Sequence, residues 1–354
     1  MTDGSIPTED ADPTAVSIPP PDEVARETAA QRQTQLLKPP GSLGRLEPMA
    51  VNIAAMQATP TPSVDPAVIL TLAGDHGVTA EGVSAYPKSV TAAMVDAVAD
   101  GNAAINALAG ATEITSHVVD MGVDGDVPAG VIDHHIADGT ANMTVEHAMT
   151  TTQARESIAA GRALVEEHAV EAGVVGLGDL GIGNTTASAA ITAALTDTAV
   201  SEVTGHGTGI DEATRQQKIE TIERALAVTD PTADDPLDVL RCVGGFEIAG
   251  LVGVTLAAAS RRIPVVVDGV VTGAAAIVAA EINEGVSKYL LGSHISTEPA
   301  HAIQLAALGV SPCLDYEMGL GEGTGAAVAI GTYRAACRAH TEMATFAEAG
   351  LDSS

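Results

Sequence analysis

The sequence predicts an α/β protein built on an open, mostly parallel sheet with helices on both faces. Short apolar runs alternate with Ala-rich stretches, which is typical of strands joined by crossover helices. Only 2% of the residues are aromatic, so Ala, Val, Leu and Ile must fill the core. Each apolar run also ends in a polar, Gly-containing segment. Such ends form the ligand crevice of an open parallel sheet, and the chain is therefore expected to be an enzyme.

Apolar runs rich in β-branched residues predict the strands, in the order 68–73, 118–121, 173–176, 264–267, 289–291 and 312–314. Helical spacing in the Ala-rich stretches predicts the helices, in the order 91–108, 154–169, 185–195, 245–259 and 274–280. Because parallel strands need crossover connections, this alternation predicts a mostly parallel sheet.

The charge of the chain excludes several kinds of partner. Its 354 residues include 46 acids and 16 bases, for a formal net charge of -30. That charge repels nucleic acid phosphates and anionic lipid head groups, so neither nucleic acid nor membrane is an expected partner. Because the acids are spread along the chain, they indicate a solvated surface adapted to high salt.

The N-terminal region and the cysteines indicate the compartment. The first 14 residues, MTDGSIPTEDADPT, lack the basic and apolar regions of a signal peptide. The three cysteines form no CxxC pair, so neither a disulfide framework nor a zinc site is expected. Residues 1–22 are polar, acidic and Pro-rich, which predicts a disordered tail. A cytoplasmic protein is expected.

Two overlapping glycine motifs follow the third predicted strand. GLGDLG over 176–181 matches a dinucleotide-binding pattern, with Asp197 about 20 residues further on. GIGNTT over 181–186 overlaps it and moves the expected start of the helix to Asn184 or Thr185. This favours an anion site at a helix N-terminus, with Asn184 or Thr185 as the cap. A dinucleotide turn and a plain loop are the alternatives.

Glu322 and Lys218 are the ionisable residues that the sequence marks most clearly. Glu322 lies between glycines in GLGEGTG, where burial would raise its pKa toward that of a general base. A helix-capping acid is the alternative. Lys218, one of four lysines, follows the Gly-rich segment 204–209 and is expected to contact either a phosphate or a surface acid. The Asp and His residues of 75–76 and 133–135 fit no metal-ligand spacing, so no metal is predicted.

Seven sequence motifs occur in a characteristic order: KPPGSLGRLE (38–47), AGDHGV (73–78) with EGVSAYP (81–87), GTANMT (139–144), GIGNTT (181–186), VGGFEI (243–248), GSH (292–294) and LGEGTGA (320–326). Together they resemble the nicotinate-nucleotide:dimethylbenzimidazole phosphoribosyltransferases of cobamide synthesis. The resemblance spans roughly residues 36 to 340.

This resemblance implies a homodimer with a Rossmann-like sheet and a small helical domain made from the chain ends. We accordingly expect residues 23–60 and the C-terminal helix 326–354 to form the small domain, and residues 61–325 the large one. It also implies transfer of ribose 5-phosphate from nicotinate mononucleotide to 5,6-dimethylbenzimidazole, giving α-ribazole 5′-phosphate and nicotinate, without a cofactor. Transfer to a different base and a nucleotide-binding module with impaired catalysis are the alternatives.

The resemblance also assigns site residues. Glu322 matches the general base of the family, and Asp179 occupies the position of a glutamate that assists it. The positions that match phosphate or nucleotide contacts are Gly181, Ile182, Gly183, Asn184, Thr185, Lys218, Ser296 and Gly321. Ser84, Tyr86 and Met94 match the base pocket loosely. The chain departs from the family in having Asp179-Leu180 in place of Glu-Met, and Gly319 in place of an arginine.

Overall fold

The computed structural model describes residues 12–351 and contains one seven-stranded sheet in which every pair is parallel. The strand order is β3-β2-β1-β4-β5-β6-β7. The strands are β1 (Ala67–Gly74), β2 (Thr115–Gly122), β3 (Ile132–Asp133), β4 (Val174–Leu180), β5 (Val265–Val267), β6 (Leu290–His294) and β7 (Pro312–Leu314). The predicted parallel α/β fold is confirmed, and the structure adds the short edge strand β3.

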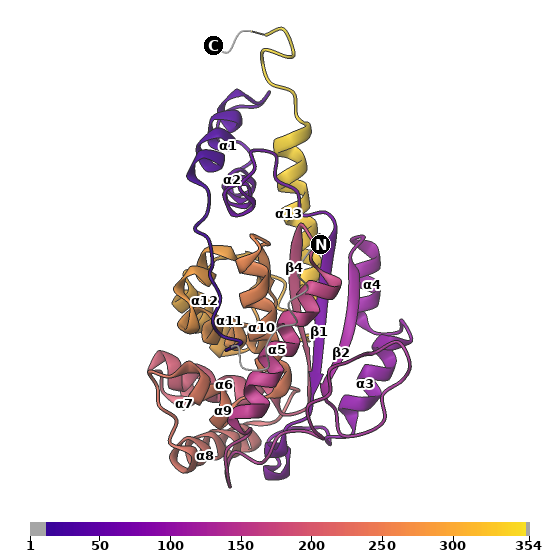
Figure 1. Ribbon diagram of the computed structural model, residues 1–354, viewed down its shortest axis with the longest axis vertical. Helices are drawn as coiled ribbons and strands as arrows, with labels where there is room; N and C mark the ends of the chain where they lie inside the picture. The colour runs from indigo at the N-terminus through magenta and orange to yellow at the C-terminus, as the bar shows by residue number, and fades with distance from the viewer. Residues whose placement is uncertain (1–11, 352–354) are drawn as a thin grey trace, which may run out of the picture.

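Helices cover both faces of the sheet (Figure 1). On one face α10 (Phe246–Ser260) and α11 (Val270–Ile282) contact the strands. On the other lie α3 (Val90–Ala99), α4 (Ala104–Ala111) and α13 (Thr324–Glu342). The remaining helices are α1 (Glu23–Gln35), α2 (Leu46–Gln57), α5 (Thr151–His168), α6 (Asn184–Thr196), α7 (Val200–Val203), α8 (Glu212–Thr229), α9 (Pro236–Val243) and α12 (Pro299–Leu308). Among residues 12–351, no helix combines the length and apolar character that crossing a bilayer requires.

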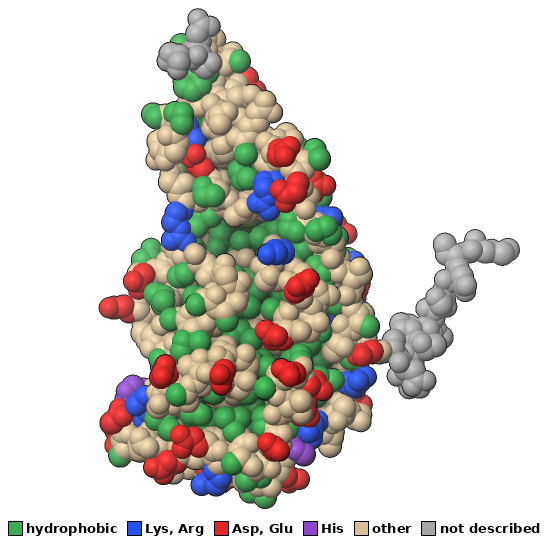
Figure 2. All heavy atoms as spheres, turned by 90° about the vertical axis from the view of Figure 1, so that its left-hand side faces the viewer, with side chains coloured by type: hydrophobic (Ala, Val, Ile, Leu, Met, Phe, Trp, Pro, Cys, Tyr) green, Lys and Arg blue, Asp and Glu red, His purple; other side chains and the backbone are tan. Residues whose placement is uncertain are grey.

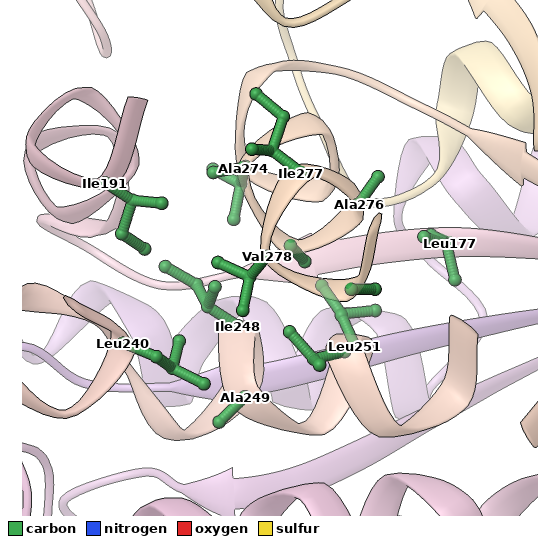
Figure 3. Packing of buried hydrophobic residues seen from close by; sticks show 14 of the residues in the cluster. Leu177, Ile191, Leu240, Ile248, Ala249, Leu251, Ala274, Ala276, Ile277 and Val278 are labelled. Atoms are coloured by element: carbon green, nitrogen blue, oxygen red, sulfur yellow. The ribbon is translucent and has the colours of Figure 1, made fainter. Parts of the chain in front are cut away.

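The core is divided by the sheet into two clusters. In β1, Leu70 and Leu72 belong to the cluster beneath α10, whereas Ile69 belongs to the cluster beneath α13. This is the alternation expected when successive side chains point to opposite faces of a strand. Figure 3 shows part of the first cluster, where aliphatic side chains of α10 and α11 meet. As predicted, Ala, Val, Leu and Ile make up most of it.

Helices α5 and α10 cross so closely that glycines are required at the contact. A Cβ atom on Gly161 would lie 1.8 Å from the carbonyl oxygen of Gly250. A Cβ atom on Gly253 would lie 2.0 Å from the carbonyl oxygen of Ile158. A backbone atom of a helix cannot move without the rest of the helix. These glycines therefore set the distance between the two helices.

The helices near the N-terminus pack against the last helix of the chain. Figure 1 shows α1 and α2 beside the C-terminal part of α13. The Arg32 Nε atom donates to the carbonyl oxygen of His340 at 2.8 Å, and Gln33 Nε2 lies 2.9 Å from His340 Nδ1. The Leu37 N–H donates to the carbonyl oxygen of Ala344 at 2.9 Å. The division of the chain into a small and a large domain stays a prediction.

The sequence-based assignment is wrong for parts of the chain. Residues 12–22 are ordered against the body, since the Tyr289 hydroxyl donates to the carbonyl oxygen of Pro19 at 2.8 Å. The rest of the predicted disordered tail, residues 1–11, lies outside the described residues. The single helix predicted over 91–108 is interrupted at Gly101, whose φ of 78° ends α3 before α4 begins. The assignment also omits α7, α8, α9 and α12.

Candidate active site

The strand order reverses between β1 and β4, and the loops that follow these strands meet at their carboxyl ends. Thr91 of α3 joins the two loops. Its Oγ1 donates to Asp75 Oδ1 at 2.7 Å and accepts from the Ile182 N–H at 3.1 Å. Ligands of open α/β sheets bind at this reversal point. The predicted gathering of loop residues at one edge is therefore observed here.

Glu322 lies at this edge of the sheet and has a strained backbone conformation. Its φ is 62°, and its neighbours Gly321 and Gly323 are also left-handed, at 85° and 86°. The Glu322 N–H donates to the carbonyl oxygen of Asp179 at 3.1 Å, and its own carbonyl accepts from Thr71 Oγ1 at 2.8 Å. These bonds from β4 and β1 hold a conformation that L-residues disfavour. Burial raises the pKa of the Glu322 carboxyl.

Asp268, at the end of β5, supports the same loop from the side. Its carboxylate accepts from the N–H groups of Ala326 at 2.7 Å and Gly323 at 3.2 Å, at the start of α13. Burial raises the pKa of Asp268 to about 7, although these backbone donors oppose the rise. Asp268 therefore caps α13 and fixes the position of Glu322.

Asp179 lies near the end of β4 with its carboxyl group buried. Its Oδ2 accepts from Asn184 Nδ2 at 2.9 Å. Burial, and then the charges of Asp268 and Glu247, raise the pKa of Asp179 well above its usual range. Such a shift favours the protonated carboxyl, which can donate a hydrogen bond, over the carboxylate.

The structure corrects the interpretation of the GLGDLG segment. Gly176 and Gly178 lie inside β4 instead of in a turn after the strand. A Cβ atom on Gly178 would lie 2.7 Å from the carbonyl oxygen of Glu322, so this glycine allows the Glu322 loop to pass close to the strand. A dinucleotide-binding motif needs these glycines in the turn after the strand. Their position inside β4 therefore argues against the dinucleotide alternative.

The helix that follows β4 is capped differently from the prediction. The N-cap residue of α6 is Gly183, with φ at 98°, and neither Asn184 nor Thr185 caps the helix. Asn184 instead reaches back to Asp179, and Thr185 Oγ1 accepts from Lys218 Nζ at 2.8 Å.

Lys218 of α8 is buried beside this helix start, with only 1% of its surface exposed. Burial lowers the pKa of its ammonium group to about 8, and the carboxylate of Glu298 opposes this shift. The loop over 204–209 passes over the ammonium group, since a Cβ atom on Gly207 would lie 3.3 Å from Nζ. Lys218 is thus a positive charge at the N-terminus of α6, where backbone N–H groups also favour an anion.

His76 and Glu247 form a second buried pair at this edge. His76 Nε2 lies 2.6 Å from Glu247 Oε1, while Glu247 Oε2 has no hydrogen-bond partner among residues 12–351. Nowhere in that part of the chain do three or more His, Cys, Asp or Glu side chains lie together as metal ligands would. The predictions of no metal and no cofactor stay predictions.

Comparisons with known proteins show the family to which the chain belongs. A family model described as "Phosphoribosyltransferase" matches residues 18–351. A nicotinate-nucleotide–dimethylbenzimidazole phosphoribosyltransferase from Roseiflexus sp. (strain RS-1) is 46% identical over 342 residues, which are 96% of this chain and 97% of the relative. An enzyme of the same name from Desulforamulus reducens is 47% identical, with the same shares covered. The chain belongs to the nicotinate-nucleotide:dimethylbenzimidazole phosphoribosyltransferase family.

Solved structures of this family have the same fold. The phosphoribosyltransferase superimposes on the crystal structure of CobT from Thermus thermophilus with a TM-score of 0.89 and 41% sequence identity. The match covers 94% of this chain and all (100%) of the other. The family resemblance and the fold predicted from the sequence are therefore confirmed.

The base-pocket residues of this phosphoribosyltransferase are only partly brought together. Ser84 Oγ lies 3.3 Å from Thr208 Oγ1, so the 81–87 segment adjoins the loop that covers Lys218. The Ser84 Oγ atom also accepts from the Tyr86 N–H at 3.3 Å, and the Tyr86 side chain is 53% exposed. Met94 lies on α3 and packs against the core cluster beneath α13. Contact with a base stays a prediction for all of them.

Two further predicted contacts lie on the loops after β6 and β7. Ser296 is half-buried, and its N–H donates to His301 Nδ1 at 3.0 Å. Gly321 lies against Asp179, since a Cβ atom there would be 3.3 Å from Asp179 Oδ2. At Gly319, where the family resemblance leads to the expectation of an arginine, a Cβ atom would lie 2.5 Å from Thr297 Oγ1. An arginine at that position therefore requires Thr297 to move.

Sequence reasoning missed the buried Asp268 and Glu247 and the half-buried Glu298, and it considered His76 only as a metal ligand. Asp268 directly follows one predicted strand, and His76 lies in the polar segment after another. Such positions are the signal that could have indicated a role in the site. Glu247 lies in the VGGFEI motif at the start of a very apolar helix, where an acid is out of pattern.

Proposed function

We propose that this phosphoribosyltransferase moves ribose 5-phosphate from nicotinate mononucleotide to 5,6-dimethylbenzimidazole in cobamide synthesis. The products are α-ribazole 5′-phosphate and nicotinate. The observation that carries the proposal is the Glu322 carboxyl group, which is buried at the reversal point of the sheet with a raised pKa. Relatives that are 46% and 47% identical over nearly their whole length bear this name.

The reaction needs one proton acceptor and one leaving group. The pyridinium nitrogen of nicotinate mononucleotide takes the electron pair of its bond to C1′, so nicotinate leaves without protonation. One ring nitrogen of the benzimidazole attacks C1′, and Glu322 accepts the proton from the other ring nitrogen. Attack from the opposite face of the ribose inverts C1′ and gives the α product.

The neighbouring carboxyl groups support this role for Glu322. Burial and nearby acids raise the pKa of Asp179, which disfavours a second negative charge beside the base. Its position fits a hydrogen-bond donor or acceptor that orients the incoming ring. Asp268 accepts hydrogen bonds from two backbone N–H groups and so holds the Glu322 loop in place. Supporting hydrogen bonds of this kind keep a catalytic side chain in its productive position.

The anion site supports binding of the substrate's 5′-phosphate. We infer that Lys218, Thr185 and the loop over 181–185 bind this phosphate, with Ser296 and Gly321 nearby. Thr185 Oγ1 is 2.8 Å from Lys218 Nζ, so one cation and one helix N-terminus converge on the same place. Ser84, Tyr86 and Met94 are proposed to contact the base.

The proposal is tested by incubating the protein in multimolar potassium chloride with nicotinate mononucleotide and dimethylbenzimidazole. Mass spectrometry should detect nicotinate and α-ribazole 5′-phosphate in equal amounts. Competing bases such as adenine and unsubstituted benzimidazole decide which base is preferred. A folded protein that binds the nucleotide without forming any ribotide would instead be a nucleotide-binding module.

Phosphate binding is expected to weaken above pH 8. The pKa of Lys218 is about 8 because burial disfavours the ammonium, so the positive charge is present below this pH and lost above it. KM for nicotinate mononucleotide should therefore rise as the pH increases from 7 to about 9. In Lys218→Met the KM should be high and independent of pH over this range. A wild-type KM that does not change with pH would contradict the assignment.

We also propose a cytoplasmic homodimer adapted to high salt. The formal charge is -30, and acidic side chains are scattered over the face in Figure 2 instead of forming one patch. Screening by salt weakens the mutual repulsion of these charges. The free energy of unfolding should therefore fall when multimolar potassium chloride is diluted to low ionic strength. Circular dichroism during urea unfolding measures this, and an unchanged urea midpoint would reject the adaptation.

A further inference from the structure

The loop over 204–209 is attached to the turn that contains Ser296 by one side chain, that of Glu298. Glu298 Oε1 accepts from the Gly207 N–H at 2.7 Å. Glu298 is the N-cap residue of α12, yet its side chain makes no capping hydrogen bond within the described chain. It extends instead across to a loop that lies 91 residues away in sequence.

The position of Gly207 leaves little freedom for this loop. Its φ is 52°, and a Cβ atom there would lie 3.0 Å from Thr185 Oγ1 and 3.3 Å from Lys218 Nζ. A Cβ atom on Gly205 would lie 2.4 Å from Glu298 Oε2. The loop backbone is therefore packed between the Glu298 carboxylate and the Lys218–Thr185 pair.

Glu298 is itself held by a rigid turn. Its N–H donates to Ser296 Oγ at 3.3 Å, and the Ser296 N–H donates to His301 Nδ1 at 3.0 Å. Burial lowers the pKa of His301 to about 3, so this nitrogen remains an acceptor throughout the neutral range. The turn can thus serve as a fixed support for a neighbouring loop.

We propose that Glu298 is a positioning residue that holds the 204–209 loop against Lys218 and Thr185, so that both loops face the phosphate of the substrate. The inference rests on the proposed function, because it assigns the phosphate to this place. A carboxylate so close to an anion site repels the anion, and its presence is explained by the contact it makes with Gly207 and by its attraction to Lys218. Glu298 acts through the loop and does not contact the reacting atoms.

Three variants distinguish this positioning role from a general loss of structure or of charge. Glu298→Ala removes both the hydrogen bond and the charge, whereas Glu298→Gln keeps an oxygen that accepts from Gly207. Glu202→Gln, on the exposed surface of α7, removes an equal charge close to the start of the same loop. Steady-state kinetics with each substrate varied in turn, and calorimetric titration with nicotinate mononucleotide, measure the effects.

We expect Glu298→Ala to raise KM and Kd for nicotinate mononucleotide about tenfold, with kcat and KM for the base within about twofold of the wild type. Glu298→Gln should restore most of the affinity, and Glu202→Gln should match the wild type. A Glu298→Ala protein with unchanged Kd would overturn the proposal. So would a loss of kcat and of affinity for both substrates together, which indicates a merely structural role.

Hydrogen–deuterium exchange without substrate tests the loop contact independently of turnover. The 204–209 segment should exchange faster in Glu298→Ala than in the wild type, and Glu298→Gln should exchange like the wild type. If the wild type forms no ribotide, the proposed function fails. The exchange and the calorimetric Kd then still decide whether Glu298 positions the loop for an anion, and equal exchange in all proteins would reject it.

Discussion

Replacing Glu322 with glutamine is expected to lower kcat by roughly 10²–10⁴-fold, because a positioned general base contributes about this much. Glutamine has nearly the same size and can still accept from the Ile105 N–H, which lies 3.4 Å from Glu322 Oε2. It cannot accept the proton of the attacking base. KM for nicotinate mononucleotide should stay within about threefold of the wild type, since that proton transfer affects the chemical step.

The same residue predicts the acid limb of the pH profile. Burial raises the pKa of Glu322 above its usual value, so the catalytic carboxylate is present above this raised pKa and lost below it. Wild-type kcat should therefore fall with decreasing pH at a higher pH than for an ordinary glutamate. The Glu322→Gln protein should lack this limb.

Glu317→Gln is a matched control for that experiment. Glu317 belongs to the same loop and also has a positive φ, of 53°, but its side chain is exposed. It should retain wild-type kcat and the wild-type pH profile. A Glu322→Gln protein with wild-type kcat, or an equal loss of kcat in the two variants, would show that Glu322 is not the general base.

Replacing Gly253 with alanine is expected to destabilise the fold by about 3 kcal/mol, because the new methyl group would overlap a carbonyl oxygen of α5. The separation of 2.0 Å is far below any contact that real Cβ atoms make, and the obstacle is backbone. The helices must move apart, which opens the packing beneath the sheet. Urea unfolding followed by circular dichroism in high salt gives the free energy of unfolding.

Gly110→Ala is the control. Gly110 also lies inside a helix, α4, and a Cβ atom there would have no heavy atom within 4 Å. Alanine should stabilise the protein by about 0.5–1 kcal/mol at this position, since it restricts the unfolded chain more than glycine does. Similar changes at the two positions would show that the α5–α10 crossing can relax without cost.

Part of the site was predictable because its signals are local. Glu322 lies between glycines after an apolar run, and Lys218 is conspicuous in a chain with four lysines. The structure places both at the reversal point and shows the burial that alters their pKa values. The roles of the GLGDLG glycines were not predictable, because the end of β4 depends on pairing with β1 through Leu180.

The sequence by itself determined the parallel α/β class and the gathering of polar residues after the strands. Both follow from periodicity and composition within short windows, where neighbouring residues alone decide which side chains share a face. Only the tertiary structure decided which distant segments the polar side chains of the site contact. Asp268 caps a helix 55 residues later, and Glu298 binds a loop 91 residues earlier. Such contacts depend on strand order and helix packing, which no local pattern encodes, because one periodicity is compatible with many arrangements of the same elements.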